Sequence, residues 1–173
     1  PPQNVFNSLL RSILGQQLSV RAAETIHQRF LNFFEGHTPT PHQLLVHQPE
    51  TLRQLGLSRQ KSQYLLNVAD FFQSQQLLQQ DWSLLSDSEI IDLLTQIKGV
   101  GKWTVEMVLI FTLHRPDVLP VDDLGIQQAF AKIYGLQLQQ PKRTLYQEMQ
   151  DIAAAWAPYR TYASRYLWQY KDQ

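Results

Sequence analysis

Two adjacent aspartates, Asp122 and Asp123, stand directly behind a proline and a valine in the segment VLPVDDLGIQQAF, at the predicted start of a helix. One aspartate there is expected as an N-cap, whose side-chain oxygen accepts a hydrogen bond from an N–H group of the first turn. A second carboxylate exceeds what a cap requires, and the helix N-terminus favours the ionised form of a carboxylate near it. The pair is therefore a candidate for chemistry as well as for capping.

A second candidate is the stretch KGVGKW, residues 98–103, which follows the apolar run IIDLLTQI. A dinucleotide fingerprint would need a preceding strand and a third glycine, and a P-loop would need a longer spacer before its lysine. What remains is a tight turn between two helices, in which glycine at 99 and 101 permits positive φ. The N–H groups of the next helix would then form an anion site flanked by Lys98 and Lys102. Taken alone, this stretch favours a plain interhelical turn.

The composition limits which elements can position these groups. A chain of 173 residues, 43% hydrophobic and 11% aromatic, is long enough for one domain or two small lobes with a shared core. The absence of cysteine excludes a disulfide, a thiolate zinc site and a cysteine-held iron–sulfur cluster. We find neither a signal-peptide pattern nor an apolar run long enough to span a membrane, so a soluble intracellular protein is expected. Because the formal net charge is zero, nucleic-acid binding would have to rest on a local cluster of groups.

Helical spacing of apolar residues and helix-start signals recur along the chain, without strand alternation or internal repeats. Ser19 and Ser58 are predicted N-caps, and SDSE at 86–89 is predicted to form a capping box. Prolines 41, 49 and 141 are placed to begin helices, and RPDVLPVDD at 115–123 is a predicted loop. These signals predict an all-α protein with about ten helices.

Four segments together resemble a known family. GVGKWTVEMVLIF followed by VLPVDDLGIQQAF is similar to the hairpin, loop and aspartate of the helix-hairpin-helix (HhH-GPD) superfamily of DNA glycosylases. The segments ILGQQLSVRAAETI (13–26), LGLSRQKSQYL (55–65) and APYRTYASRYLW (157–168) resemble further parts of it in the same order. The similarity spans nearly the whole chain and is closest to the alkylpurine branch, the 3-methyladenine DNA glycosylase II type.

The resemblance implies an all-α, two-lobed fold with a cleft between the lobes, in a single domain over residues 1–173. One lobe would comprise residues of about 20–115 with the hairpin, and the other the N-terminal helix at about 1–19 together with about 116–173. It also implies a monofunctional enzyme that flips alkylated purines out of double-stranded DNA and hydrolyses their N-glycosidic bond. No cofactor and no membrane would be involved, and the enzyme would act as a monomer, in the nucleoid or in the nucleus.

The resemblance further implies roles for single residues. Asp123 is the expected catalytic carboxylate because Ile126 stands at the family's offset from it, and Asp122 would cap the helix or support Asp123. Bifunctional relatives carry a lysine nucleophile where this chain has Trp103, so water is expected to complete the reaction. Trp103 and Trp168 would line the base pocket, with Met107 beside them, although an aromatic residue at such positions is often core.

DNA contacts are implied at three places. Gln17 would plug the gap left by the flipped base, with Leu18 and then Gln16 as alternatives; these residues could also be no more than a polar helix break. The expected phosphate-binding residues, of which the last two are equally compatible with a solvated basic turn, are Gly99, Val100, Gly101, Lys102, Thr104, Arg59 and Lys61. No transition-metal site is expected, but hairpin carbonyls near Gly99 and Gly101 could hold a monovalent cation.

Two other functions fit parts of the pattern. A glycosylase for oxidised, deaminated or mismatched bases would share the fold, but the oxidised-guanine type usually keeps the lysine and the adenine-mismatch type a cysteine-held cluster. A non-catalytic DNA-binding module would need the hairpin alone, and the aspartate pair with two tryptophans argues against it.

Overall fold

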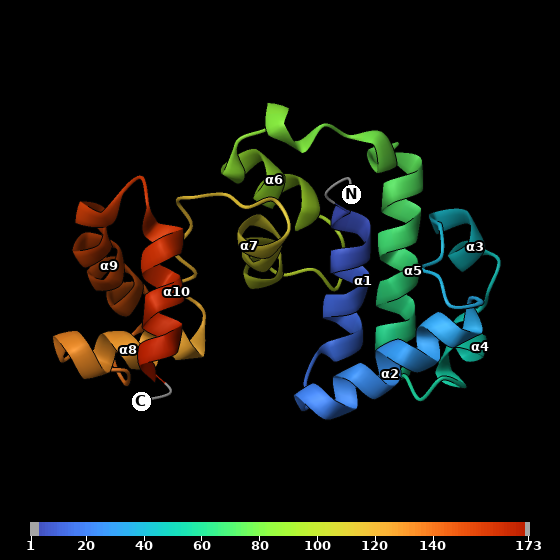
Figure 1. The fold of residues 1–173 in the computed structure, drawn as a ribbon, viewed down its shortest axis with the longest axis horizontal. Coiled ribbons are helices and arrows are strands. Elements are labelled where there is room, and N and C mark those ends of the chain that lie inside the picture. Colours follow the sequence, from blue (N-terminus) through green and yellow to red (C-terminus); the bar gives the residue numbers. More distant parts are fainter. Residues whose placement is uncertain (1–3, 172–173) are drawn as a thin grey trace. The chain divides into compact units, whose positions relative to one another are not determined.

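The structure is a computed structural model that describes residues 4–171, and within that range it is helical and contains no strand. The all-α prediction is therefore confirmed (Figure 1). The α-helices are α1 (Val5–Gly15), α2 (Val20–Phe33), α3 (Pro41–Leu45), α4 (Pro49–Arg53), α5 (Arg59–Ser74), α6 (Asp87–Leu94), α7 (Lys102–Phe111), α8 (Leu124–Tyr134), α9 (Lys142–Ala153) and α10 (Arg160–Lys171). Short 3-10 turns are η1 (Leu77–Gln79), η2 (Trp82–Leu84) and η3 (Ala154–Trp156).

The chain divides into two compact units, one that ends at Val108 and one that begins at Leu109, so that the boundary falls within α7. This differs from the expected division, in which the N-terminal helix joins the C-terminal lobe. Helix α1 groups with the first unit because its apolar face packs against α2 and α5. The buried side chains of that face are Val5, Phe6, Leu9, Leu10, Ile13 and Leu14.

Helix α5 is the centre of the first unit. It lies beside α1, and α3 and α4 also pack on it (Figure 1). Phe72 of α5 meets Phe6 of α1 with ring centroids 5.2 Å apart, and both rings are buried. The buried side chains of α5, among them Leu65, Val68 and Phe72, form an apolar stripe on which the surrounding helices pack.

The predicted helix starts are confirmed. Ser19 accepts a hydrogen bond from the Ala22 N–H at 3.3 Å, and Ser58 accepts one from the Lys61 N–H at 3.1 Å. At α6 the Ser86 hydroxyl and the Glu89 carboxylate form the reciprocal bonds of a capping box. Local sequence is sufficient to set these boundaries because a capping side chain and the backbone N–H that donates to it lie within one turn of each other.

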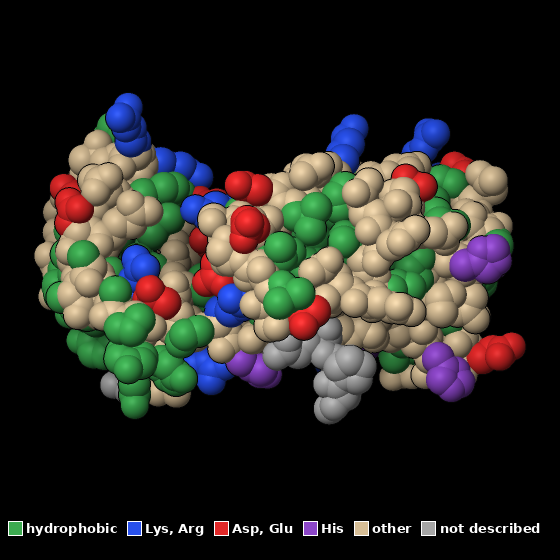
Figure 2. Space-filling model, turned by 90° about the horizontal axis from the view of Figure 1, so that it is seen from above, with side chains coloured by type: hydrophobic (Ala, Val, Ile, Leu, Met, Phe, Trp, Pro, Cys, Tyr) green, Lys and Arg blue, Asp and Glu red, His purple; other side chains and the backbone are tan. Residues whose placement is uncertain are grey.

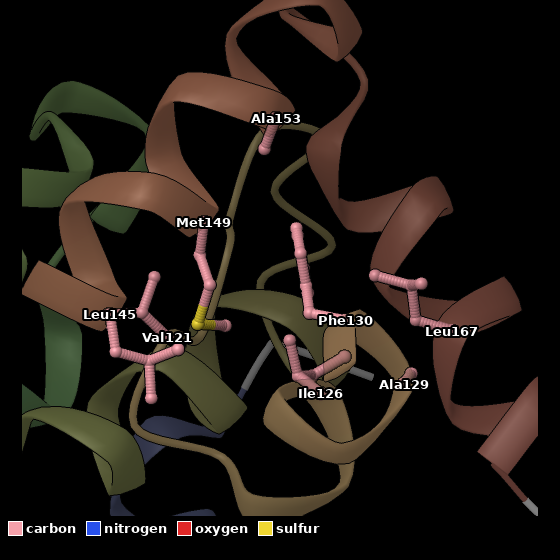
Figure 3. Close-up of a cluster of buried hydrophobic side chains, with 8 residues drawn as sticks. All are labelled: Val121, Ile126, Ala129, Phe130, Leu145, Met149, Ala153 and Leu167. Carbon is pink, nitrogen blue, oxygen red and sulfur yellow. The ribbon is translucent and has the colours of Figure 1, made fainter. Parts of the chain in front are cut away.

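The second unit is built around α8, whose Phe130 points between side chains of α9 and α10, among them Met149 and Leu167 (Figure 3). The buried cluster comprises Val121, Ile126, Ala129, Phe130, Leu145, Met149, Ala153 and Leu167. Because Val121 and Ile126 flank the aspartate pair, the segment that carries the two carboxylates is fixed on both sides by core packing.

The loop between α7 and α8 is tied to the start of α10. The Asp117 carboxylate accepts from Arg160 through Nε at 2.7 Å and Nη2 at 2.8 Å, and also from its backbone N–H at 3.1 Å. The Thr161 hydroxyl donates to the Arg115 carbonyl at 2.7 Å and accepts from the Val118 N–H at 2.9 Å. These bonds attach the loop that leads into α8 to the start of α10.

We predict that Asp117→Asn destabilises the protein by about 1.5–3 kcal/mol, the usual contribution of hydrogen bonds to charged groups. The hydrogen bond from Arg160 holds the pKa of Asp117 below its ordinary value of 3.8, while burial acts in the opposite direction. A carboxyl whose pKa is depressed by folding stabilises the protein above its unfolded pKa, and this stability is lost as the pH falls through the folded pKa.

The measurement is urea unfolding between about pH 2 and pH 7. The loss of stability that Asp117 causes below about pH 3.8 should be absent from the variant. Asp70→Asn, at an exposed position of α5, is the matched control and should keep the acid profile of the wild type. Identical acid profiles for wild type and Asp117→Asn would contradict the assignment.

Candidate active site and nucleic-acid interface

Asp123 is the N-cap of α8, with its side chain half-buried. Its Oδ1 accepts two hydrogen bonds, from the Ile126 backbone N–H at 2.9 Å and from the Trp168 indole Nε1–H at 2.8 Å. A carboxylate that accepts hydrogen bonds from two N–H groups at a helix N-terminus is fixed in position. It is therefore preorganised to face a positive charge.

Asp122 is exposed and is held by a different set of partners. The Tyr146 hydroxyl donates to its Oδ1, and the Lys142 ammonium lies 3.5 Å from the same atom. Burial and the bond to Asp122 raise the pKa of Tyr146 above its ordinary value. The alternative that Asp122 caps the helix is therefore wrong, because Asp123 makes that bond; Asp122 instead attaches the loop to α9.

Trp168 lies in an aromatic group that sequence spacing did not reveal. Its ring stacks on Phe111 with centroids 5.7 Å apart and an interplanar angle of 25°. The Arg165 guanidinium lies 5.7 Å from the Phe111 ring centroid. Phe111 is 52% exposed although it ends an apolar run, so this exposed aromatic residue could be recognised only once the fold was known. Tyr146 was missed for the same reason, since it stands 24 positions from Asp122.

The two glycines of the hairpin differ. Gly99 has φ +108°, and a Cβ built on it would lie 2.3 Å from the Tyr64 ring, so only glycine fits there. Gly101 lies outside the positive-φ region, and a Cβ there would meet no atom within 4 Å. The expectation of positive φ at both positions is therefore wrong for Gly101. Because Gly101 has no side chain, the space before α7 is open, and an anion can approach the N-terminus of that helix.

The other expected phosphate-binding residues of the hairpin differ in how far their side chains are buried. Lys102 is exposed and lies 3.7 Å from Glu106 on the next turn. Val100 and Thr104 have buried side chains, and the Val100 N–H donates to the Ile97 carbonyl at 3.0 Å. Side-chain contacts with DNA are therefore excluded for Val100 and Thr104 in this conformation, and the surface offered by the hairpin is Gly101, Lys102 and the start of α7.

Two hairpin carbonyls in the region expected to hold a monovalent cation already have donors. The Lys98 carbonyl accepts from the Asn67 side chain at 3.0 Å, and the Gly99 carbonyl from the Gln16 side chain at 3.4 Å. Since a carbonyl has two lone pairs, an ion would have to share these oxygens with the amides. The cation stays a prediction. Among the described residues, no group of three or more His, Cys, Asp or Glu side chains is arranged to hold a metal ion.

The loop between α1 and α2 carries the three residues that are candidates for insertion into DNA. Gln17 adopts φ +58°, a left-handed conformation that non-glycine residues adopt at a cost of about 1–3 kcal/mol and that clusters at functional sites. Leu18 beside it is 40% exposed. Gln16 is half-buried and donates to the hairpin, so it anchors the loop and is the least suited of the three to enter DNA.

The two basic residues at the start of α5 also differ in their contacts. Arg59 is exposed and stands 4.0 Å from Glu50. The Lys61 ammonium donates to the Leu14 carbonyl at 3.2 Å, and burial lowers its pKa below the ordinary value. Lys61 therefore holds the end of α1, and a role in phosphate binding would be additional to that bond.

Trp103 is 40% exposed, which excludes the alternative of a fully buried core residue. Met107 lies one turn further along α7 and is half-buried. Trp103 and Met107 belong to the first unit, whereas Asp123 and Trp168 belong to the second. Among the expected pocket residues, Trp168 is the one that the structure shows hydrogen-bonded to Asp123.

Known repair proteins are similar to this chain in sequence. The model of the HhH-GPD superfamily of base excision DNA repair proteins matches residues 10–155. DNA-3-methyladenine glycosylase 1 of Schizosaccharomyces pombe is 37% identical over 166 residues, which cover 95% of this chain and 71% of that protein. The alkylbase DNA glycosidase-like protein mag2 of the same yeast is 33% identical, covering 98% and 79%.

Solved structures of repair proteins are also similar to this chain. S. pombe 3-methyladenine DNA glycosylase in complex with abasic DNA superimposes with a TM-score of 0.79 at 36% identity, over 97% of this chain and 81% of that one. The DNA-3-methyladenine glycosidase of Bacillus halodurans gives 0.81 at 36% identity, over 99% and 76%. The chain therefore belongs to the HhH-GPD superfamily of base excision DNA repair proteins.

We predict opposite effects for the two hairpin glycines. Gly99→Ala should cost at least about 1–3 kcal/mol of stability, because the new Cβ meets Tyr64 at an unfavourable φ. Gly101→Val should change stability by no more than about 1 kcal/mol, the scale of an N-cap effect, yet weaken binding to any duplex several-fold. Thermal unfolding and fluorescence anisotropy with undamaged duplex separate the effects. Unchanged duplex binding by Gly101→Val would exclude the anion site.

We also predict that Trp168→Phe lowers the rate of the chemical step about 10- to 100-fold, because Asp123 is deprived of a hydrogen bond worth about 1.5–3 kcal/mol. Trp156→Phe is the matched control: its ring packs on Phe130 in the same unit, and the rate should stay near that of the wild type. Single-turnover assays report the chemical step directly. Equal rates for the two variants would show that the indole N–H does not position Asp123.

Proposed function

We propose that this chain is a monofunctional DNA glycosylase of base excision repair that removes alkylated purines, of the 3-methyladenine and 7-methylguanine type, from double-stranded DNA. The observation that carries the proposal is the Asp123 carboxylate, fixed by the N-terminus of α8 and by the Trp168 indole. The relatives named for 3-methyladenine glycosylase activity, one of them solved with abasic DNA, support this choice of substrate.

The chemistry follows from the charge of the damaged base. An alkylated purine is flipped out of the stack at a cost of a few kcal/mol. It is already cationic, so it leaves with the electron pair of the N-glycosidic bond as a neutral base and needs little acid assistance. As that bond stretches, positive charge moves to the sugar, where the carboxylate of Asp123 stabilises it and orients the water that attacks C1′. The attacking water passes its proton to the Asp123 carboxylate, and the products are the free base and an abasic site.

Water is the proposed nucleophile because Trp103 occupies the position at which bifunctional members of the family carry a lysine. Without an amine at that position no Schiff base forms by the usual route, and the DNA strand stays intact. The exposed face of Trp103 would stack on the electron-poor purine. The same residue, with the absence of cysteine, argues against a glycosylase for oxidised or mismatched bases.

The test is base release from duplexes that carry a single 3-methyladenine, 7-methylguanine, 1,N6-ethenoadenine, hypoxanthine or 8-oxoguanine. Release should be strongest for the alkylated purines, with strand breaks only after alkali. Asp123→Asn should reduce the rate about 100- to 1,000-fold, as expected for losing one preorganised electrostatic group, while lesion binding persists.

Asp122→Asn is the matched control, because it changes the neighbouring carboxylate without touching the bonds to Ile126 and Trp168. Its effect should be smaller and should fall partly on stability, through the contacts with Tyr146 and Lys142. A larger loss of rate in Asp122→Asn than in Asp123→Asn would transfer the catalytic role to Asp122. Strand cleavage without alkali would contradict the monofunctional mechanism.

A further inference from the structure

A groove of about 680 Å³ lies in the first unit between α2 and the turn that leads into α5; we call it the α2–α5 groove. One end of it is formed by the inserting loop at 16–19, and its α2 wall continues to Arg29. The α2 residues at positions 22, 25, 26 and 29 share one face of the helix, which explains how a single helix forms the whole wall.

The groove is cationic although the chain as a whole is neutral. Arg21, Arg29 and Lys61 line it, and none of the described lining residues is acidic. Glu24 on α2 is paired with Arg11 at 3.1 Å and does not line the groove. Figure 2 shows basic and acidic side chains interspersed on the face that it displays, so a groove whose charged lining residues are all cationic is a local feature rather than a consequence of net charge.

The shape of the groove suits a sugar-phosphate backbone. Its floor contains the buried side chains Ile26 and Leu57, and the exposed Arg21 and Arg29 stand above it on α2. Gly56 has φ +93°, and a Cβ there would come within 3.1 Å of Ile26 and 3.3 Å of Arg29. Glycine thus allows the turn to approach α2 and keeps space for an anion beside the Arg29 guanidinium. An apolar floor can take deoxyribose while the guanidinium groups pair with phosphates.

The inserting loop is bounded by two anion-receiving surfaces. On one side Gln16 donates to the Gly99 carbonyl of the hairpin, and on the other Gln17, Leu18 and Ser19 line the groove. A side chain that fills the gap left by a flipped base lies between the two strands. The surfaces on either side of it therefore face the backbones of different strands. If the hairpin holds the damaged strand, the groove faces the undamaged strand.

We propose that the α2–α5 groove binds the sugar-phosphate backbone of the undamaged strand opposite the lesion, with Arg21 and Arg29 contacting its phosphates. The proposal rests on the proposed function, because it takes the loop to be the inserting element and the hairpin to hold the damaged strand. It adds a second strand-specific surface, through which the protein distinguishes duplex from single-stranded DNA.

The test uses Arg21→Gln/Arg29→Gln with Arg53→Gln/Arg143→Gln as the matched control, since Arg53 and Arg143 are exposed and do not line the groove. Binding to a duplex and to a single strand, each with a tetrahydrofuran abasic analogue, is measured between about 50 and 200 mM salt. The slope of log affinity against log salt for the duplex should fall by about 1.8, or roughly 0.9 for each phosphate that the variant no longer neutralises, with single-strand affinity unchanged. The control should keep the wild-type slope.

A second measurement identifies the strand. Methylphosphonate groups opposite the abasic analogue should weaken duplex binding by the wild type but not by Arg21→Gln/Arg29→Gln. Equal losses on duplex and single strand would show that the groove holds the damaged strand, and an unchanged duplex slope would show that it holds no DNA; either result overturns the proposal. Failure of the proposed function would be seen separately, as no release of alkylated purines by the wild type while these binding results are unaffected.

Discussion

The structure of the site depends on the start of α8, where the Asp123 carboxylate accepts from the Ile126 N–H and from the Trp168 indole. The first bond is local and fixes the carboxylate relative to the helix axis and dipole. The second joins it to α10 across 45 positions of sequence. A carboxylate held in both ways needs no reorganisation when positive charge develops nearby, which is the basis of electrostatic catalysis.

Several contacts between side chains hold the start of α8 in position. Asp117 and Arg160 attach the α7–α8 loop to α10, Asp122 attaches it to α9, and Val121 and Ile126 bury its flanks. The loop has no regular secondary structure, so its conformation comes from these side-chain contacts together with single backbone bonds, such as the one from the Thr161 N–H to the Pro116 carbonyl at 3.0 Å. A small set of polar bonds with one apolar cluster thereby holds the carboxylate that we propose to be catalytic on a protein of otherwise ordinary helices.

The surfaces that we propose to contact DNA lie in the first unit and do not require a large net charge. The hairpin offers the N-terminus of α7 behind Gly101, the inserting loop holds Gln17 in a left-handed conformation, and the α2–α5 groove gathers three cations. Gln16 and Lys61 connect these parts through backbone carbonyls. Affinity that is divided among a few positioned contacts favours a particular distorted DNA geometry over general attraction to polyanions.

The sequence by itself determined the helices, their caps at Ser19, Ser58 and Ser86, and the family motifs, because periodicity and capping act within one or two turns. It also singled out Asp123 and Trp168, though as separate residues. Only the tertiary structure decided that α1 belongs with the first unit, that Asp123 rather than Asp122 caps α8, and that of the two hairpin glycines Gly99 alone needs positive φ. The placement of α1 and the requirement for positive φ at Gly99 depend on contacts between segments distant in the chain, such as Tyr64 against Gly99, which no local pattern encodes.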